Sequence, residues 1–166
     1  GVTIFVKILG EKIPSSQTAF LRYLFGTIFL LPIIINSFRD IQIKLINKFI
    51  LRSFFHAIGV SLWFYSMTVI TIAEVTAIGY LTPIFVCIGA IIFFKENIKG
   101  FRAFAIALSF IGAMIILRPG FQEIKLGQYS MLLAAFVFSF SYLMVKYLAE
   151  TKSSLEIVGY LSLFTT

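Results

Sequence analysis

Charged residues are scarce in this sequence. Only 13% of its 166 residues are Asp, Glu, Lys or Arg, whereas soluble domains contain about 25%. Hydrophobic residues make up 60% of the chain and aromatic residues 17%. Because so few polar side chains cannot cover a surface that faces water, the composition excludes an ordinary soluble domain. It predicts an integral membrane protein.

The residue types of membrane-embedded catalytic centres are also nearly absent. The chain has one cysteine, Cys87, one histidine, His56, and one aspartate, Asp40, and none lies at a metal-ligand spacing from another. Nucleophile–base pairs, paired aspartates and metal clusters all need more of these groups. We therefore expect no enzyme activity, no metal and no cofactor. A single cysteine also excludes an intramolecular disulfide.

Long hydrophobic runs, by contrast, fill most of the chain. Five of them lie between the charged clusters: Thr18 to Phe38, Phe54 to Ile72, Thr76 to Phe94, Phe101 to Leu117 and Tyr129 to Leu148. Each is close to the roughly 17 to 25 residues that cross a hydrocarbon core of about 30 Å as a helix. The runs are continuous, whereas the strands of a membrane barrel would alternate. The sequence therefore predicts an all-α, polytopic fold.

Further hydrophobic residues flank these five runs. Residues Gly1 to Val6 resemble the end of an earlier span, and a run that begins near Leu155 continues to Thr166. We expect a fragment that starts late in a first helix and stops within a seventh.

Basic residues are unevenly divided between the loops. The loops after the second, fourth and sixth expected helices hold most of them: Arg39, Lys44, Lys48, Arg52, Lys95, Lys99, Arg102 and Lys152. Because cytoplasmic loops are enriched in Lys and Arg, these loops are predicted to be cytoplasmic. The net charge of +7 thus reflects topology, and we expect no nucleic-acid partner.

Several short motifs follow one another in a distinctive order. They are Leu81-Thr82-Pro83-Ile84-Phe85, Ile91 to Asn97 with Glu96 in the turn, Phe110 to Ala113, and Leu117-Arg118-Pro119-Gly120. In this order the chain resembles the EamA branch of the drug/metabolite transporter superfamily over nearly its whole length. One departure is Lys95, which stands where this turn often has glycine.

The resemblance implies a carrier of ten helices, built from two five-helix repeats, that moves a small organic solute by alternating access. Residues 1–120 would form the first repeat, with its first helix truncated, and residues 121–166 the start of the second. The expected location is the inner (plasma) membrane of a bacterium. Some spacings are similar to S-adenosylmethionine uptake carriers, but amino-acid exporters share much of the pattern. The sequence leaves open whether the protein forms a homodimer.

A weak internal repeat supports this interpretation without reference to the family. Val6 to Glu11 is similar to Val145 to Glu150, and each segment is followed by a serine pair, at Ser15-Ser16 and Ser153-Ser154. Because five helices per repeat is an odd number, the second repeat must be inverted in the membrane. This favours a transporter over the alternative, a non-transporting membrane scaffold or interaction protein.

Polar residues inside the spans are the candidates for a substrate pathway, because such groups are costly in a membrane and often functional. One candidate is Arg22 in the second span. The others share a face with one another at helical spacing within their spans, and they are Ser61, Tyr65, Thr68, Thr76, Tyr80, Pro83, Ser139, Tyr142 and Lys146.

Some of these residues have a second interpretation. Pro83 removes a backbone donor within its span, which either directs a free carbonyl into the pathway or only shapes the packing. Lys146 either lines the pathway or extends to the membrane surface. Arg22 either gates the solute or anchors the helix at the interface. Glu74 lies in a tight external turn, where capping of a helix is favoured over proton coupling.

Overall fold

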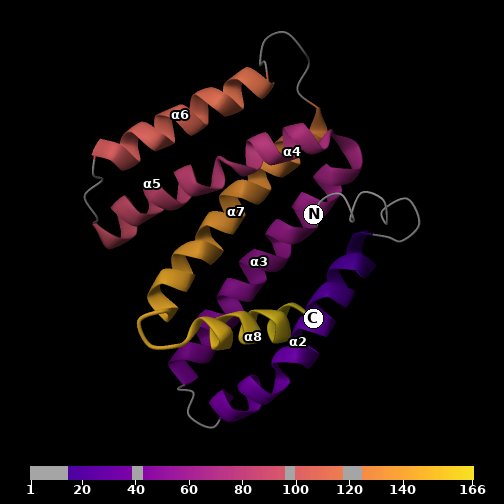
Figure 1. Ribbon diagram of the computed structural model, residues 1–166. Coiled ribbons are helices and arrows are strands. Elements are labelled where there is room, and N and C mark those ends of the chain that lie inside the picture. The colour runs from indigo at the N-terminus through magenta and orange to yellow at the C-terminus, as the bar shows by residue number, and fades with distance from the viewer. Residues whose placement is uncertain (1–14, 39–42, 96–99, 118–124) are drawn as a thin grey trace.

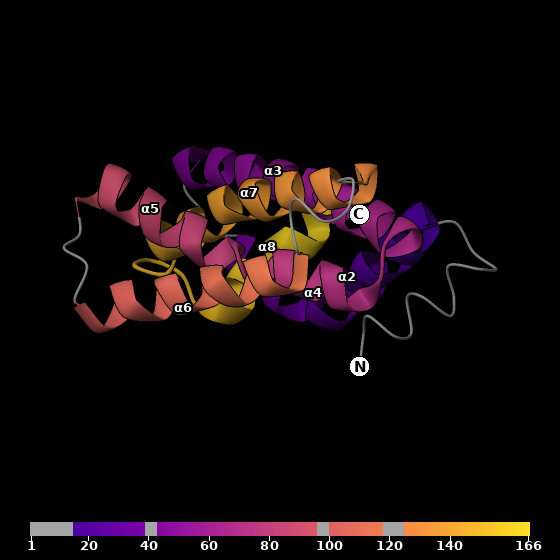
Figure 2. The ribbon, with the colours of Figure 1, turned by 90° about the horizontal axis from the view of Figure 1, so that it is seen from above.

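A computed structural model describes residues 15–38, 43–95, 100–117 and 125–166. Its helices are α2 (Ser15–Phe38), α3 (Ile43–Val69), α4 (Ile72–Gly79), α5 (Thr82–Phe94), α6 (Gly100–Leu117), α7 (Leu126–Leu148) and α8 (Ser154–Thr165). All regular elements in these ranges are helices, which confirms the all-α prediction (Figure 1). Seen from above, α3 and α7 form one layer, and α4 and α6 lie in a second (Figure 2).

Four segments are long and apolar enough to cross a membrane: Ala19–Ser37, Leu45–Val69, Ile72–Phe94 and Leu126–Leu148. They correspond to the second, third, fourth and sixth predicted helices. The fifth corresponds to α6, which includes the apolar stretch Ala103–Gly112, and the seventh to the shorter apolar helix Ser154–Thr165. Large hydrophobic side chains such as Phe29 and Phe101 face outward, as expected of a surface in contact with lipid.

The start of the third helix differs from the prediction. The hydrophobic run begins at Phe54, but α3 begins at Ile43. Lys44, Lys48 and Arg52 therefore belong to a helix, and their assignment to a loop was wrong. Charged residues interrupt a hydrophobic run without ending a helix, because Lys and Arg are good helix formers.

The fourth span is broken into two helices. α4 ends at Gly79 and α5 begins at Thr82, with Tyr80 and Leu81 between them. Pro83 lies in the first turn of α5, where its missing N–H breaks no helical hydrogen bond. The predicted fourth span is confirmed over Ile72–Phe94. Within it, Pro83 follows a two-residue turn in which Tyr80 and Leu81 keep right-handed helical dihedral angles.

The core of the described chain lies where α7 packs on α3 and α5. Val60, Phe64 and Met67 of α3 are buried against Met131 and Ala134 of α7. Small residues permit this approach: a Cβ added at Gly59 would lie 2.8 Å from Phe138 Cδ1. Close packing at small residues is how membrane helices associate.

α8 packs antiparallel to α2 and also contacts α3 (Figure 1). Ser37, near the end of α2, contacts Glu156 in the first turn of α8. Thr27, near the middle of α2, contacts Thr166 directly after α8. Phe49 of α3 and Tyr160 of α8 are both fully buried, with ring centroids 4.7 Å apart.

Lys95 follows the last residue of α5 in the left-handed region, with φ of 51° and ψ of 35°. This conformation is costly for a residue with a Cβ and free for glycine. Glycine is therefore the residue expected here on physical grounds, and Lys95 adopts the backbone geometry that glycine favours.

Some predictions fall outside the described residues. They concern Val6 to Glu11, Arg39, Asp40, the turn from Glu96 to Lys99, and Arg118 to Gly120.

Candidate functional site

The break between α4 and α5 lies against α7, since both half-helices pack on it. Tyr80 and Pro83, at the break, are exposed, whereas Leu81 and Thr82 are buried. Irregular backbone within a span is tolerated only where it is buried in protein or lines a water-filled cavity. Packing on α7 meets the first of these two conditions for the buried residues Leu81 and Thr82.

Most hydroxyl groups of the predicted pathway bond within their own helices. Each hydroxyl donates to a backbone carbonyl oxygen three or four residues earlier: Ser61 Oγ to Ala57 O (2.9 Å), Thr68 Oγ1 to Tyr65 O (2.7 Å), Thr76 Oγ1 to Ile72 O (2.8 Å) and Ser139 Oγ to Phe136 O (2.6 Å). Ser139 is buried, while the other three and Tyr65 are exposed on their helices. These bonds satisfy the hydroxyl protons locally, so the groups need no solute.

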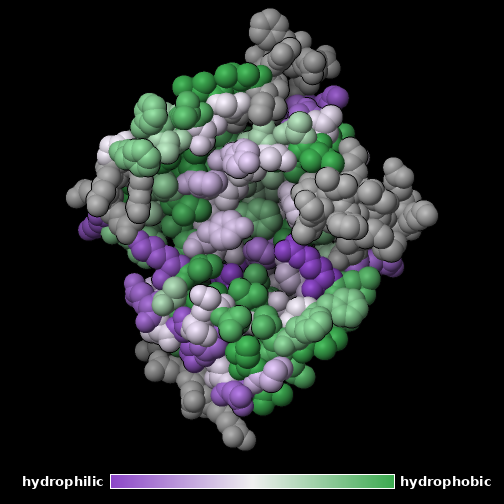
Figure 3. Space-filling view, viewed as in Figure 1, coloured by the Kyte–Doolittle hydropathy of each residue, from purple (hydrophilic) through white to green (hydrophobic). Residues whose placement is uncertain are grey.

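Two cations of the predicted pathway contact aromatic rings. The Arg22 guanidinium lies 5.5 Å from the ring centroid of Tyr23. The Lys146 ammonium lies 4.5 Å from the ring centroid of Phe94, at the end of α5. Figure 3 shows hydrophilic side chains gathered in a band across the middle of one face, with hydrophobic surface on either side.

A polar cluster that the sequence analysis missed lies between α2, α3, α7 and α8. Arg52 is only 5% exposed, and its Nη1 donates a hydrogen bond of 2.7 Å to the carbonyl oxygen of Ile157. His56 lies one turn further along α3. Its ring meets Tyr23 edge to face at 6.1 Å, and its Nδ1 is 3.4 Å from Ser141 Oγ.

This cluster includes polar atoms that are costly to bury. The Tyr23 hydroxyl, Arg52 Nε and Ser53 Oγ are buried without a hydrogen-bond partner among the described residues. Tyr142 of the predicted pathway is within electrostatic range of Tyr23 and Arg52. Buried ionisable groups within membrane spans are usually functional. The four-residue spacing of Lys48, Arg52 and His56 indicates one helical face, and that spacing was the available signal.

A second polar network joins the start of α8 to α2. Glu156 accepts hydrogen bonds from Ser37 Oγ and from Lys152 Nζ, the latter at 3.1 Å. Its carboxylate and the Ser153 hydroxyl also cap the helix reciprocally. The Ser37 hydrogen bond is the largest of the effects that lower the pKa of Glu156 to about 2. Glu156 lies in the first turn of α8, outside the four candidate spans.

Glu74 caps α4, as predicted. Its carboxylate accepts from the Thr71 backbone N–H at 2.9 Å, and its own N–H donates to Thr71 Oγ1 at 3.3 Å. The other carboxylate oxygen accepts a hydrogen bond of 2.6 Å from Gln128 Nε2. Glu74 thus fixes the start of α4 against α7.

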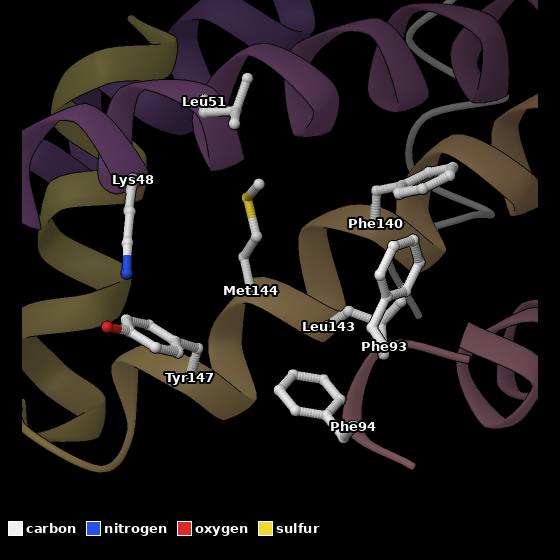
Figure 4. Close-up of a pocket in the computed structure, with 8 residues that line it drawn as sticks. All are labelled: Lys48, Leu51, Phe93, Phe94, Phe140, Leu143, Met144 and Tyr147. Atoms are coloured by element: carbon white, nitrogen blue, oxygen red, sulfur yellow. The ribbon is translucent and has the colours of Figure 1, made fainter. Parts of the chain in front are cut away.

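A groove of about 340 Å³ lies between the ends of α3, α5 and α7. Its lining is shown in Figure 4 and consists of Lys48, Leu51, Phe93, Phe94, Phe140, Leu143, Met144 and Tyr147. Lys48 Nζ lies 3.3 Å from the ring centroid of Tyr147. The groove is separate from the α4–α5 break and was not predicted.

The chain is similar to known membrane carriers. The sequence profile of the EamA-like transporter family matches residues 1–118. The chain is 26% identical over 164 residues to an S-adenosylmethionine uptake transporter of Rickettsia prowazekii (strain Madrid E). This alignment covers 98% of the chain and 55% of the transporter.

Riboflavin transporters are similar to the same degree. That of Brucella anthropi is 28% identical over 155 residues, covering 93% of the chain and 55% of that protein. That of Vibrio cholerae is 29% identical over 157 residues, covering 93% and 53%. The chain thus spans about half the length of these relatives. No solved structure shows a significant match.

Proposed function

Because the chain belongs to the EamA-like transporter family, we propose that it forms part of a carrier that moves a small organic metabolite across the plasma membrane. The carrier works by alternating access between two inverted repeats, residues 1–120 and the unit that begins at residue 121.

The relation between α2 and α8 is the observation that supports this proposal most strongly. A shift of 139 positions aligns Val6 with Val145 in the sequence. The same shift aligns Leu24 with Leu163, Phe25 with Phe164 and Thr27 with Thr166. Thr27 and Thr166 are 139 residues apart, and their hydroxyl oxygens are 3.3 Å from each other. A residue that contacts its own equivalent lies on a two-fold axis. An axis of this kind relates inverted repeats in transporters.

The contacts of α8 supply a gate for such a mechanism. Glu156 and Lys152 bind Ser37 of α2, and the Ile157 carbonyl accepts from Arg52 of α3. These bonds hold the second repeat against the first at the predicted cytoplasmic ends of α2 and α3. Alternating access requires that they separate when this side opens, so we assign Arg52 and Glu156 to the gate.

The solute pathway of the proposal lies on the face with the α4–α5 break. It comprises the polar residues predicted from the sequence other than Lys146, which lies over Phe94 at the opposite end of α5 from the break. Tyr80 and Tyr142 are its exposed aromatic walls. The two relatives' names specify S-adenosylmethionine and riboflavin, and both compounds contain a flat heteroaromatic ring. Aromatic walls suit such rings. We therefore propose a heteroaromatic metabolite as the solute.

Flux measurements on the full-length protein test this function. Proteoliposomes that contain it are expected to take up labelled S-adenosylmethionine or riboflavin with saturable kinetics, and an excess of the same unlabelled compound on the opposite side should accelerate the uptake. Protein-free vesicles are the control. Absence of exchange with either compound, in correctly folded protein, would favour the alternative of a non-transporting scaffold.

A further inference from the structure

The groove between α3, α5 and α7 combines an apolar interior with a cationic rim. Leu51, Phe140, Leu143 and Met144 provide aliphatic and aromatic lining, and Phe93 and Phe94 close the side formed by α5 (Figure 4). Its volume of about 340 Å³ lies at the lower end of the range of ligand pockets, which is roughly 300 to 1,000 Å³.

The cations gather where the three helices end. Lys48 is near the start of α3, and Lys146 is in the last turn of α7. The Lys48 ammonium lies over Tyr147 and the Lys146 ammonium over Phe94, and both rings line the groove. Lysines at the ends of spans place their charge at the level of the lipid phosphates.

We propose that this groove binds one anionic phospholipid, with an acyl chain against the apolar lining and the phosphate between Lys48 and Lys146. Among the described residues nothing closes the groove from the outside of the helix bundle, since Phe93 is 65% exposed and Tyr147 42%. Basic pockets between helices on the cytoplasmic side are a known form of site for anionic lipids. A free phosphate would leave the apolar lining without a partner.

The inference is independent of transport. It needs only that the three helix ends lie at the membrane surface where anionic lipids are present. A scaffold with this fold would bind the lipid equally.

Lipid binding to the full-length protein in detergent tests the proposal. Phosphatidylglycerol and phosphatidylcholine with identical acyl chains are titrated, and bound lipid is counted by native mass spectrometry. We expect one phosphatidylglycerol to bind in preference to phosphatidylcholine and to raise the unfolding temperature. Lys48→Gln and Lys146→Gln should each weaken this binding by about fivefold. Lys125→Gln, at the opposite end of α7, is the matched control and should leave binding unchanged.

Two further measurements separate the contribution of the lipid headgroup from that of the acyl chain. Met144→Trp fills the groove and keeps both lysines, and it should reduce phosphatidylglycerol binding. Inorganic phosphate alone should neither bind nor stabilise. Equal binding of the two lipids, an equal effect of Lys125→Gln, full binding by Met144→Trp, or stabilisation by phosphate alone would each overturn the proposal. Each variant's stability is first measured in phosphatidylcholine, so that a folding defect is not counted as lost lipid binding.

Discussion

The hydroxyl oxygens of Thr27 and Thr166 lie 3.3 Å apart, although the residues are 139 positions apart in the chain. The antiparallel helices α2 and α8 meet at this point. The same offset matches Leu24 to Leu163 and Phe25 to Phe164. The sequence similarity and the spatial contact are independent observations, and together they favour an internal two-fold axis between inverted repeats.

Cross-linking tests this axis. In full-length protein whose native cysteines, Cys87 among them, are replaced by serine, the pair Thr27→Cys and Thr166→Cys should react with a short bifunctional thiol reagent, because the two positions are in contact. The pair Thr27→Cys and Leu155→Cys should not, because Leu155 lies at the other end of the antiparallel α8. Cross-linked peptides are identified by mass spectrometry. Equal yields from both pairs would contradict the antiparallel arrangement.

The gate assigned to Arg52 predicts a loss of transport. Arg52→Met keeps much of the side-chain volume but removes the hydrogen bond to the Ile157 carbonyl. We expect lower flux per folded molecule, because the closed state loses a contact between the repeats. Arg52→Met also leaves the buried Ile157 carbonyl without this donor, which costs about 1 to 3 kcal/mol of stability, so flux is compared per folded molecule. Lys125→Met is the control. Unchanged flux per folded molecule together with a large loss of stability would make Arg52 purely structural.

The carboxylate of Glu156 predicts a pH effect on stability. Its pKa is lowered from 4.5 to about 2, chiefly by the hydrogen bond from Ser37. A group with a lowered pKa in the folded state stabilises it above the unfolded pKa, and this contribution is lost as the pH falls. Unfolding temperatures measured from pH 7 to pH 3 should therefore fall less steeply for Ser37→Ala than for the wild type. Parallel curves would contradict this role of Ser37.

The hydrophobic pattern predicted the spans well, because length and continuity of apolar residues are what a bilayer selects. It placed the start of α3 too late, because Lys48 and Arg52 look like loop residues until their partners, the Tyr147 ring and the Ile157 carbonyl, are known. Those partners lie about 100 residues further along the chain, so only tertiary structure reveals them.

The candidate site was predicted in a similar, partial way. Helical spacing identified polar faces, since that depends on local geometry alone. It did not reveal that the fourth span breaks before Pro83, nor that Arg52, His56 and Tyr23 gather in one cluster. Which side chains line a solute pathway depends on how helices distant in sequence come together, and the ten predicted residues stay a prediction.

The backbone at Lys95 predicts a stabilising substitution. Its φ of 51° costs a residue with a side chain about 1 kcal/mol relative to glycine. Lys95→Gly should therefore raise the unfolding free energy by about that amount. Lys95→Ala removes the same charge but keeps a Cβ, so it should give no such gain. Chemical unfolding of both variants in the same detergent separates the backbone effect from the charge effect.

Tyr80 tests the position of the solute pathway. It lies at the break between α4 and α5 and is 61% exposed, so Tyr80→Ala removes few core contacts. We expect the apparent solute affinity to change while expression and thermal stability stay nearly the same. Tyr129→Ala, which truncates a tyrosine of 56% exposure on α7, should alter neither property.

A buried aromatic residue sets the scale for the opposite result. Phe64 is 1% exposed, and its truncation to alanine should destabilise the protein by about 3 to 5 kcal/mol. If Tyr80→Ala lowers stability to a similar extent and leaves the affinity unchanged, Tyr80 packs against parts of the full-length protein and does not contact the solute. Affinity and flux per folded molecule, measured on all three variants in one preparation, decide between these roles because only a pathway residue changes affinity without unfolding the carrier.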